Sequence, residues 1–362
     1  MTLSALRRLA VARSLFSPTT VRQATARFGF IQADPIRAPA RAQDLTLRHR
    51  VTGYRAGDLE RRFHTLGLEE DFFVNYGFVT DGIHRLMHPR VDSAGWSRTR
   101  RLRAVEVLEF VRGRGEVHPR EVDAHFAHGT VVNYWGGSSN ATTHLLEHMQ
   151  YRGLLRVTRR EKGIRIYAAH DLAAREPIAL SPAERVDALV DVAVMLYAPL
   201  PGRTLSMLAN RLRYGVPQWQ RLLKAALARA RRRLAHARLD GVDWYWPAAE
   251  DPAGASPDDA VRLLAPFDPV VWDRTRFELL WGWAYRFEAY TPAPKRKFGY
   301  YALPVLWGER VIGWANLSVV DGDLRVGLGY VSGAAPRSRQ FRRALESELD
   351  AFRAFLGHTR NP

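Results

Sequence analysis

The chain has 362 residues, with 54 Lys plus Arg against 37 Asp plus Glu, a formal net charge of +17. Its length suggests two or three packed domains, and its 46% apolar content argues against global disorder. The absence of cysteine excludes a disulfide scaffold, a Cys-ligated zinc site, an iron–sulfur cluster and a Cys nucleophile. No apolar run approaches the roughly 18 residues of a membrane span. The positive charge favours a polyanionic partner, nucleic acid first and a membrane surface second.

The basic residues are strongly biased towards arginine. Only four of them are Lys, at positions 162, 224, 295 and 297, and the other 50 are Arg. A GC-rich genome explains why arginine replaces lysine. It does not explain why basic residues outnumber acidic ones by 17, so the charge still points to nucleic acid.

Two helices and a short strand are predicted at the start of the chain. Leucines recur at helical spacing over residues 3–16, and the turn 17–20 supplies an N-cap for a helix over 20–28. An apolar strand over 28–33 follows. The segment holds five Arg and no acid before position 34, a composition also found in transit peptides. Because it has no small-residue cleavage site after a long apolar core, we expect a folded domain and a cytoplasmic protein.

The next part of the chain predicts a winged helix. A helix near 56–66 and an aromatic run over 71–78 come first. The pattern of three helices followed by a two-stranded hairpin is that of a winged helix, whose third helix can enter the major groove while the wing touches the backbone. The predicted elements are helices over 98–114, 119–126 and 141–152, and strands over 154–158 and 164–168.

A third group of helices is predicted over 182–197, 204–213 and 217–237, before short extended pieces that end at 243–246. The stretch 217–239 holds seven basic residues and no acid. A solvated helix face usually mixes charges of both signs, so a helix of one sign favours contact with phosphates. The alternative is a soluble outer face without a partner.

Residues 261–333 predict an antiparallel sheet or a small barrel. Strands over 286–290 and 300–306 are predicted to flank the loop 291–299, and Gly308-Glu309 and Asp321-Gly322 are hairpin turn signals. A closing amphipathic helix is predicted over residues 337–356.

Several catalytic motifs are absent from the sequence. It has no GxxxxGK[ST] phosphate loop, no GxGxxG after a strand and no HExxH. No nucleophile elbow supports a Ser-His-Asp triad. The twelve His are scattered without a convincing ligand pair, so the sequence predicts no metal site.

Gln32-Ala33-Asp34 is the strongest catalytic candidate. On a strand, Gln32 and Asp34 point to the same face, which would place an amide beside a carboxylate. An amide can orient a water, and a carboxylate can activate it or stabilise a developing cation. The alternative interpretation is that Asp34 forms a turn with Pro35 and Gln32 lies at a strand edge.

The loop Lys295-Arg296-Lys297 is the second candidate. Three adjacent cations flanked by prolines and aromatics suit a phosphate contact or insertion into a groove. The alternative is an exposed basic turn.

The sequence resembles the winged-helix DNA glycosylases of the bacterial crosslink-repair type, the YcaQ/AlkZ-like superfamily. The match runs through most of the chain in four ordered segments, and the first fits the family's Gln-x-Gln or Gln-x-Asp motif. The segments are Phe30-Ile31-Gln32-Ala33-Asp34; Tyr134-Trp135-Gly136 with Leu145, Leu146, Gly153, Arg159-Arg160 and Arg165-Ile166-Tyr167; Leu264-Ala265-Pro266-Phe267-Asp268 with Trp272-Asp273-Arg274; and Tyr285-Arg286-Phe287-Glu288 through Pro292-Ala293-Pro294-Lys295-Arg296 to Gly299-Tyr300-Tyr301 and Leu303-Pro304.

The resemblance implies an α+β fold of tandem winged helices around a concave basic channel, with a small antiparallel β-barrel and a C-terminal helix. The predicted segments are 1–97 with the Gln-x-Asp motif, 98–175 and 176–250 as further winged helices, and 251–362 as the barrel with its helix.

The resemblance also implies a monomeric, monofunctional DNA glycosylase without a cofactor. It would act on N7-alkylated purines in double-stranded DNA, including interstrand crosslinks. Gln32 would position the attacking water, and Asp34 would activate it. The residues expected to bind DNA are Arg159, Arg160, Arg165, Lys295, Arg296 and Lys297.

One segment departs from the family's pattern. After the aromatic pair Phe72-Phe73 the family has a His-Glu-Ala segment, whereas this chain reads Asn75-Tyr76-Gly77. The departure motivates an alternative function, a winged-helix DNA-binding protein or regulator without catalysis. A membrane-surface role for the basic helix is a weaker alternative, because Leu222, Leu223 and Leu227 are expected to pack inward.

Overall fold

The structure, a computed structural model, describes residues 1–91, 95–132, 137–172 and 178–357. The chain divides into two compact units. Unit 1 comprises Met1–Leu59, Val190–Ala209 and Leu227–Pro362, and unit 2 comprises Glu60–Leu189 and Asn210–Ala226. Both units are discontinuous in sequence, so the four predicted segments stay a prediction of local organisation.

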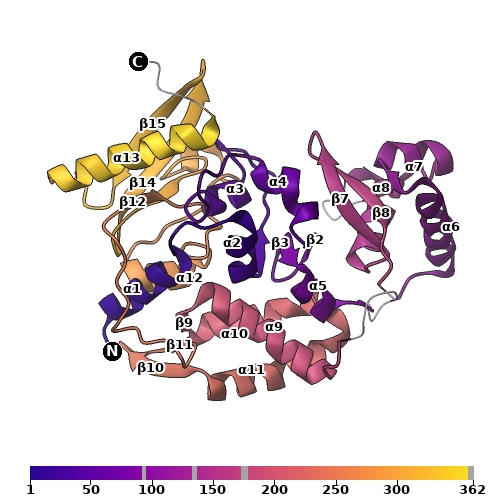
Figure 1. Ribbon diagram of the computed structural model, residues 1–362, viewed down its shortest axis with the longest axis horizontal. Coiled ribbons are helices and arrows are strands. Elements are labelled where there is room, and N and C mark those ends of the chain that lie inside the picture. The colour runs from indigo at the N-terminus through magenta and orange to yellow at the C-terminus, as the bar shows by residue number, and fades with distance from the viewer. Residues whose placement is uncertain (92–94, 133–136, 173–177, 358–362) are drawn as a thin grey trace. The chain divides into compact units, whose positions relative to one another are not determined.

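The fold mixes helices with small antiparallel sheets, which confirms the α+β class (Figure 1). The helices are α1 (Leu3–Ser14), α2 (Val21–Phe28), α3 (Ala42–Leu47), α4 (Asp58–Arg62), α5 (Asp81–Met87), α6 (Arg98–Arg114), α7 (Pro119–Phe126), α8 (Ala141–Tyr151), α9 (Pro182–Tyr197), α10 (Gly202–Arg211), α11 (Leu223–Arg233), α12 (Arg274–Trp281) and α13 (Arg339–Leu356). Short 3-10 turns lie at Phe63–Thr65, Leu212–Tyr214, Pro217–Leu222 and Ala293–Lys295.

The strands form hairpins and small sheets. They are β1 (Phe30–Gln32), β2 (Leu68–Phe72), β3 (Tyr76–Thr80), β4 (Glu116–Val117), β5 (Thr130–Val132), β6 (Ser138–Asn140), β7 (Leu155–Glu161), β8 (Ile164–Ala169), β9 (Leu200–Pro201), β10 (Ala235–Leu239), β11 (Val242–Trp246), β12 (Val261–Leu263), β13 (Leu303–Trp307), β14 (Arg310–Val320) and β15 (Asp323–Tyr330). Unit 1 holds sheets in the orders β10-β11-β9 and β12-β13-β14-β15, and unit 2 holds the sheet β4-β8-β7.

Local capping explains how β1 is positioned in unit 1. Thr20 accepts a hydrogen bond from the backbone of Gln23 in a capping box that starts α2. Gly29, with a φ of 70°, ends the helix. The chain then enters β1 directly, so the predicted helix, helix, strand order is confirmed and Gln32 is the last residue of the strand.

The predicted hairpin turns join the strands of the largest sheet. Gly308-Glu309 connects β13 to β14, and Asp321-Gly322 connects β14 to β15 with φ values of 51° and 83°. Helix α13 packs against the sheet at β12 (Figure 1). The predicted closing helix is therefore confirmed.

The predicted β-barrel is wrong for the part of the chain that the structure describes. The sheet is open, with β12 at one edge and β15 at the other. The strand expected over 286–290 is absent, because the Glu288 carboxylate accepts hydrogen bonds from the backbone of Lys297, Phe298 and Gly299 at 2.9, 2.7 and 3.3 Å. These contacts fold the segment into a loop instead of a strand that could close the sheet.

The long helix expected over 217–237 is also wrong in part. Residues 217–222 form a 3-10 turn, with Trp219 at non-helical φ and ψ, before α11 begins. From Ala235 the chain becomes β10 and pairs in register with β11. Pairing with this next strand of the hairpin, three to eleven residues further along the chain, overrides the local helical pattern.

Unit 2 contains the predicted helices and hairpin of the second segment. Helices α6 and α7 have the expected bounds, and Lys162-Gly163 turns the chain between β7 and β8 with φ values of 49° and 89°. Helix α6 buries only part of its apolar residues. Leu102 and Val105 are 55% and 54% exposed, whereas Ala104, Val107 and Val111 are buried. The motif at 134–136 lies outside the described residues.

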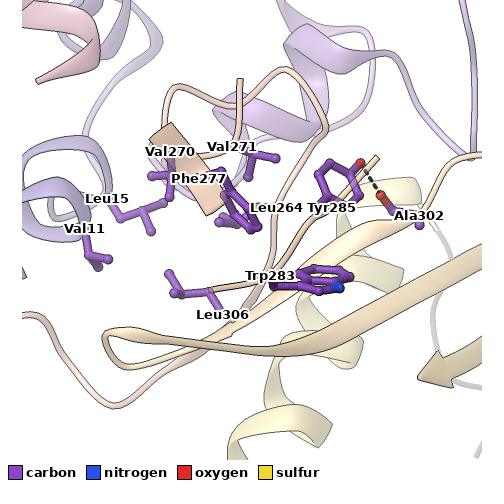
Figure 2. Close-up of a cluster of buried hydrophobic side chains, with 10 residues drawn as sticks. All are labelled: Val11, Leu15, Leu264, Val270, Val271, Phe277, Trp283, Tyr285, Ala302 and Leu306. Atoms are coloured by element: carbon purple, nitrogen blue, oxygen red, sulfur yellow. Dashed lines mark hydrogen bonds between the residues drawn. The ribbon is translucent and has the colours of Figure 1, made fainter. Parts of the chain in front are cut away.

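An apolar cluster in the core of unit 1 includes residues of the family-like segments. Figure 2 shows side chains from α1, from the segment before α12 and from the sheet meeting around Phe277. The buried hydroxyl of Tyr285 donates a hydrogen bond to the Ala302 carbonyl at 2.8 Å. The cluster consists of Val11, Leu15, Leu264, Val270, Val271, Phe277, Trp283, Tyr285, Ala302 and Leu306.

Unit 1 also contains a buried ion pair between Arg50 and Asp268. Arg50 and Asp268 are both 0% exposed, and the two guanidinium nitrogens contact the two carboxylate oxygens at 2.7 and 3.0 Å. Arg50 also donates to the carbonyls of Ser14 and Thr46, and Asp268 accepts from the backbone of Val270. Each charge is therefore paired and hydrogen-bonded, which a buried charge requires.

We expect Asp268→Asn to lower the free energy of unfolding by about 3–5 kcal/mol, because it leaves the Arg50 charge buried without a counter-ion. Urea denaturation followed by tryptophan fluorescence measures the loss. Asp350→Asn, which changes an exposed carboxylate on α13, should change the midpoint little. A loss below about 1 kcal/mol for Asp268→Asn would contradict the role of this pair.

Candidate active site

Gln32 and Asp34 lie in unit 1, at the end of β1 and in the loop that follows. Both side chains are half-buried, between the interior of the unit and solvent. The sequence predicted a strand over 28–33, and the observed strand is shorter, Phe30–Gln32, because α2 extends to Phe28 and Gly29 caps it. Asp34 lies beyond the strand, so the expectation that strand geometry places it on the same face as Gln32 does not apply. An amide and a carboxylate two residues apart therefore emerge where the strand gives way to irregular backbone.

The Gln32 amide is hydrogen-bonded to a distant residue. The indole Nε1 of Trp272 donates to Gln32 Oε1 at 2.8 Å. The Trp272 ring stacks on buried Tyr197, with ring centroids 4.8 Å apart and planes at 29°. Trp272 belongs to one of the family-like segments, but nothing in the sequence pairs it with Gln32, 240 positions away.

The Asp34 carboxylate is part of a turn. Its Oδ1 accepts from the backbone N–H of Ile36 at 2.9 Å, and its own N–H donates to Gln43 Oε1 at 3.3 Å. The turn that the alternative interpretation predicted is therefore present. Burial raises the pKa of Asp34, and the hydrogen bond from Ile36 offsets part of that rise. A carboxylate with a raised pKa is a better proton acceptor than an ordinary one.

Tyr301 adds a buried phenol to the same unit. Its side chain is 3% exposed, and within the described residues its hydroxyl has no hydrogen-bond partner. Burial and then the charge of Asp34 raise the pKa of Tyr301 well above its ordinary value. Its ring packs edge to face on Phe287, with centroids 5.3 Å apart.

The backbone of the basic loop is hydrogen-bonded to the side chain of Glu288. Glu288 holds the backbone at residues 297–299, as described above. Lys295 and Lys297 extend into solvent. Arg296 is half-buried, donates to the Thr291 carbonyl at 2.8 Å and lies over the Tyr300 ring. The two lysines are therefore presented outward, and Arg296 supports the loop.

The arginines of the predicted wing, in unit 2, contact acids of the same chain. Arg159, exposed on β7, pairs with Glu116 at 3.0 Å and with Glu161. Arg160 forms two hydrogen bonds to Glu70. Arg165 contacts Glu147 at 2.9 Å. Part of the positive charge predicted for DNA is thus compensated locally.

The departing segment Asn75-Tyr76-Gly77 lies at the β2–β3 hairpin of unit 2. The Tyr76 hydroxyl donates to Glu70 at 2.7 Å, and Arg211 donates to the Asn75 side chain at 3.1 Å. Arg165 lies over the Tyr76 ring, 4.5 Å from its centroid. The departure thus belongs to the same network of side chains as Arg160.

Sequence reasoning missed a buried group of possible metal ligands in unit 2. Asp71, His84 and His88 bring one donor atom each within 4.8 Å of one another, and the i, i+4 spacing of the two His on and after α5 was the available signal. Burial lowers the pKa of both His. Burial alone would raise the pKa of Asp71, but Arg90 and the two His lower it well below its usual range.

The contacts of Asp71 argue against a metal ion there. Arg90 donates to both carboxylate oxygens, at 2.6 and 3.0 Å, and His88 Nε2 lies 2.8 Å from one of them. A divalent cation would have to displace these partners and add charge beside a buried guanidinium. The cluster therefore reads as a buried ion pair with supporting imidazoles.

The comparisons with known proteins agree with the motifs that unit 1 brings together. No solved structure matches the chain. Among the described helices, none is long and apolar enough to cross a membrane. The family model described as DNA glycosylase AlkZ-like matches residues 25–355, a range that includes Gln32, Asp34, Trp272 and the basic loop. The chain belongs to the AlkZ-like DNA glycosylase family.

Proposed function

We propose that this protein is a monofunctional DNA glycosylase that hydrolyses the N-glycosidic bond of N7-alkylated purines, including purines in interstrand crosslinks. Gln32 positions the water, and Asp34 activates it. The observation that carries the proposal is the half-buried Asp34 carboxylate with a raised pKa, two residues from an amide fixed by Trp272. Membership of a DNA glycosylase family supports the reaction class.

The chemistry suits an amide and a carboxylate without a metal or organic cofactor. An N7-alkylated purine carries a positive charge, so the base leaves with the electron pair of the broken C1′–N bond and becomes neutral. The water oxygen bonds to C1′, and its proton passes to Asp34. The negative carboxylate also stabilises the cationic character of the sugar. Without a Schiff-base lysine, the product is an abasic site.

The order of elements in unit 2 supports DNA binding through a winged helix. Helix α6, strand β4, helices α7 and α8, and hairpin β7–β8 follow one another, and the sheet order is β4-β8-β7. In this arrangement α8 is the helix that enters the groove, and the hairpin is the wing. We assign DNA contacts to Arg159, Arg160 and Arg165 of unit 2, to Lys295, Arg296 and Lys297 of unit 1, and to the basic stretch 217–239.

The predicted location and oligomeric state are part of the same proposal. We propose a cytoplasmic location, where a DNA glycosylase would meet its substrate. One active site, formed by Gln32 and Asp34 of a single chain, suffices for a monomer.

A second candidate function is DNA binding without catalysis. It is favoured by Asn75-Tyr76-Gly77, which replaces the segment expected from the family's pattern. Base release from an alkylated duplex separates the two candidates.

We expect Asp34→Asn to slow the release of N7-methylguanine from a methylated duplex by at least about 100-fold, because it removes the general base. Gln32→Ala should also reduce release strongly, and both variants should still bind DNA. Single-turnover base release measures the rate. Matched controls are Asp350→Asn and Gln340→Ala, which alter an exposed carboxylate and an exposed amide on α13.

Two outcomes would contradict this proposal in different ways. Release at the parent rate by both Asp34→Asn and Gln32→Ala would show that these residues are not catalytic. Tight binding of the parent protein to one site in a sequence library, with no release from any alkylated or crosslinked duplex, would favour the non-catalytic binder.

The pH profile of base release should have an acid limb set by Asp34. The base works only when ionised, and burial raises its pKa above the ordinary 3.8. The rate should therefore be constant at neutral pH and fall as the pH drops through a midpoint above 3.8. Circular dichroism establishes the range in which the protein stays folded. An acid limb at or below 3.8 would contradict the raised pKa.

Lys295→Ala together with Lys297→Ala should weaken binding to any duplex, whatever its sequence. Each lost phosphate contact should reduce the slope of log affinity against log salt by about 0.9. Fluorescence anisotropy at several salt concentrations measures the slope, with Arg343→Ala on α13 as the control cation. An unchanged slope would remove the loop from the DNA-binding surface.

A further inference from the structure

Trp272 is anchored at both its backbone and its ring. Its backbone N–H donates to the Asp268 carbonyl at 2.8 Å. The Asp268 side chain is paired with the buried Arg50. Its indole ring stacks on Tyr197, which is 3% exposed. The adjacent Asp273 caps α12 by accepting from the Thr275 backbone at 3.0 Å. The indole N–H is therefore held in one place and direction.

This fixed donor determines the orientation of the Gln32 amide. An indole N–H can only donate, and a carboxamide has an accepting oxygen and a donating NH2 group. The contact of 2.8 Å thus identifies the atom facing Trp272 as oxygen. A rotation of 180° about the last side-chain torsion would put two donors face to face. The NH2 group of Gln32 therefore points away from the Trp272 indole.

We propose that Trp272 is a positioning residue for the glycosylase reaction, which fixes Gln32 so that its NH2 group, and not its oxygen, meets the attacking water. This inference rests on the catalytic role proposed for Gln32 and Asp34. Trp272 itself touches neither the water nor the substrate.

The polarity of the amide decides whether the water is reactive. A water that accepts a hydrogen bond from Gln32 and donates one to Asp34 keeps its second lone pair for attack at C1′. If the Gln32 oxygen faced the water instead, it would compete with Asp34 for a water proton. The water would then be poorly oriented for attack at C1′. Misorientation of a catalytic group lowers the rate of the chemical step more than substrate affinity.

A double-mutant cycle in single-turnover base release tests the inference. Trp272→Phe removes the N–H and keeps an aromatic ring against Tyr197. We expect it to lower the maximal rate by about tenfold or more, with the half-saturating protein concentration within about twofold of the parent value. In a Gln32→Ala background the same change should alter the rate by less than about twofold, because coupled residues are not additive.

The control is Trp281→Phe, in the same unit. Trp281 Nε1 donates to the Glu309 carbonyl at 2.9 Å, so this variant also removes one indole hydrogen bond, at a place with no contact to Gln32. It should release base at the parent rate. A thermal melt of each variant separates loss of folding from loss of orientation.

Gln32→Glu tests the donor role without altering Trp272. A carboxylate still accepts from the indole but has no NH2 group, so we expect a rate as low as that of Gln32→Ala. A parent-like rate for Gln32→Glu would overturn the proposed polarity, whether or not Trp272→Phe folds.

The outcomes distinguish this inference from the proposed function. If Gln32→Ala and Trp272→Phe slow release additively, Trp272 does not act through Gln32, and only the positioning role fails. The same holds if Trp272→Phe retains the parent rate while Gln32→Ala does not. If Gln32→Ala itself releases base at the parent rate, the catalytic role of Gln32 fails, and the inference fails with it.

Discussion

The buried pair of Arg50 and Asp268 is the constraint on which the site in unit 1 depends. Neither charge reaches water, so each must be neutralised and hydrogen-bonded by the other and by nearby backbone. The pair ties the end of α1 and α3 to the segment before α12. The backbone N–H of Trp272 donates to the Asp268 carbonyl, and the indole N–H of Trp272 donates to Gln32. The Gln32 amide, at the end of a three-residue strand, is thus connected by hydrogen bonds through Trp272 to a buried ion pair.

The cations that give the chain its net charge of +17 do not all remain exposed in the structure. Arg160 and Arg165 are drawn into contacts with Glu70 and Glu147, and Arg50 and Arg90 serve the interior. Lys295 and Lys297, by contrast, are exposed on a loop stiffened by Glu288. Sequence composition counts all these cations equally, although only the exposed ones are available to phosphates without breaking an internal pair.

Helices with strong local signals were predicted well. The bounds of α6, α7 and α9 agree with the expected ranges, because caps and apolar spacing lie within the element itself. Strand 286–290, the barrel and the end of the helix over 217–237 were wrong for one shared reason. Each depended on a contact outside the predicted element: the backbone of residues 297–299 for the segment of Glu288, and the hairpin strand β11 for the residues that became β10.

The sequence alone determined the α+β class, the position of Gln32 and Asp34 at a strand end, and the resemblance that the family match bears out. These features rest on short-range patterns and on an ordered set of motifs. Only the tertiary structure decided which side chain orients Gln32, which cations remain exposed, and that Asp34 has a raised pKa. Hydrogen-bond partners and burial depend on residues far apart in the sequence, 240 positions for Gln32 and Trp272, whose proximity no local pattern encodes.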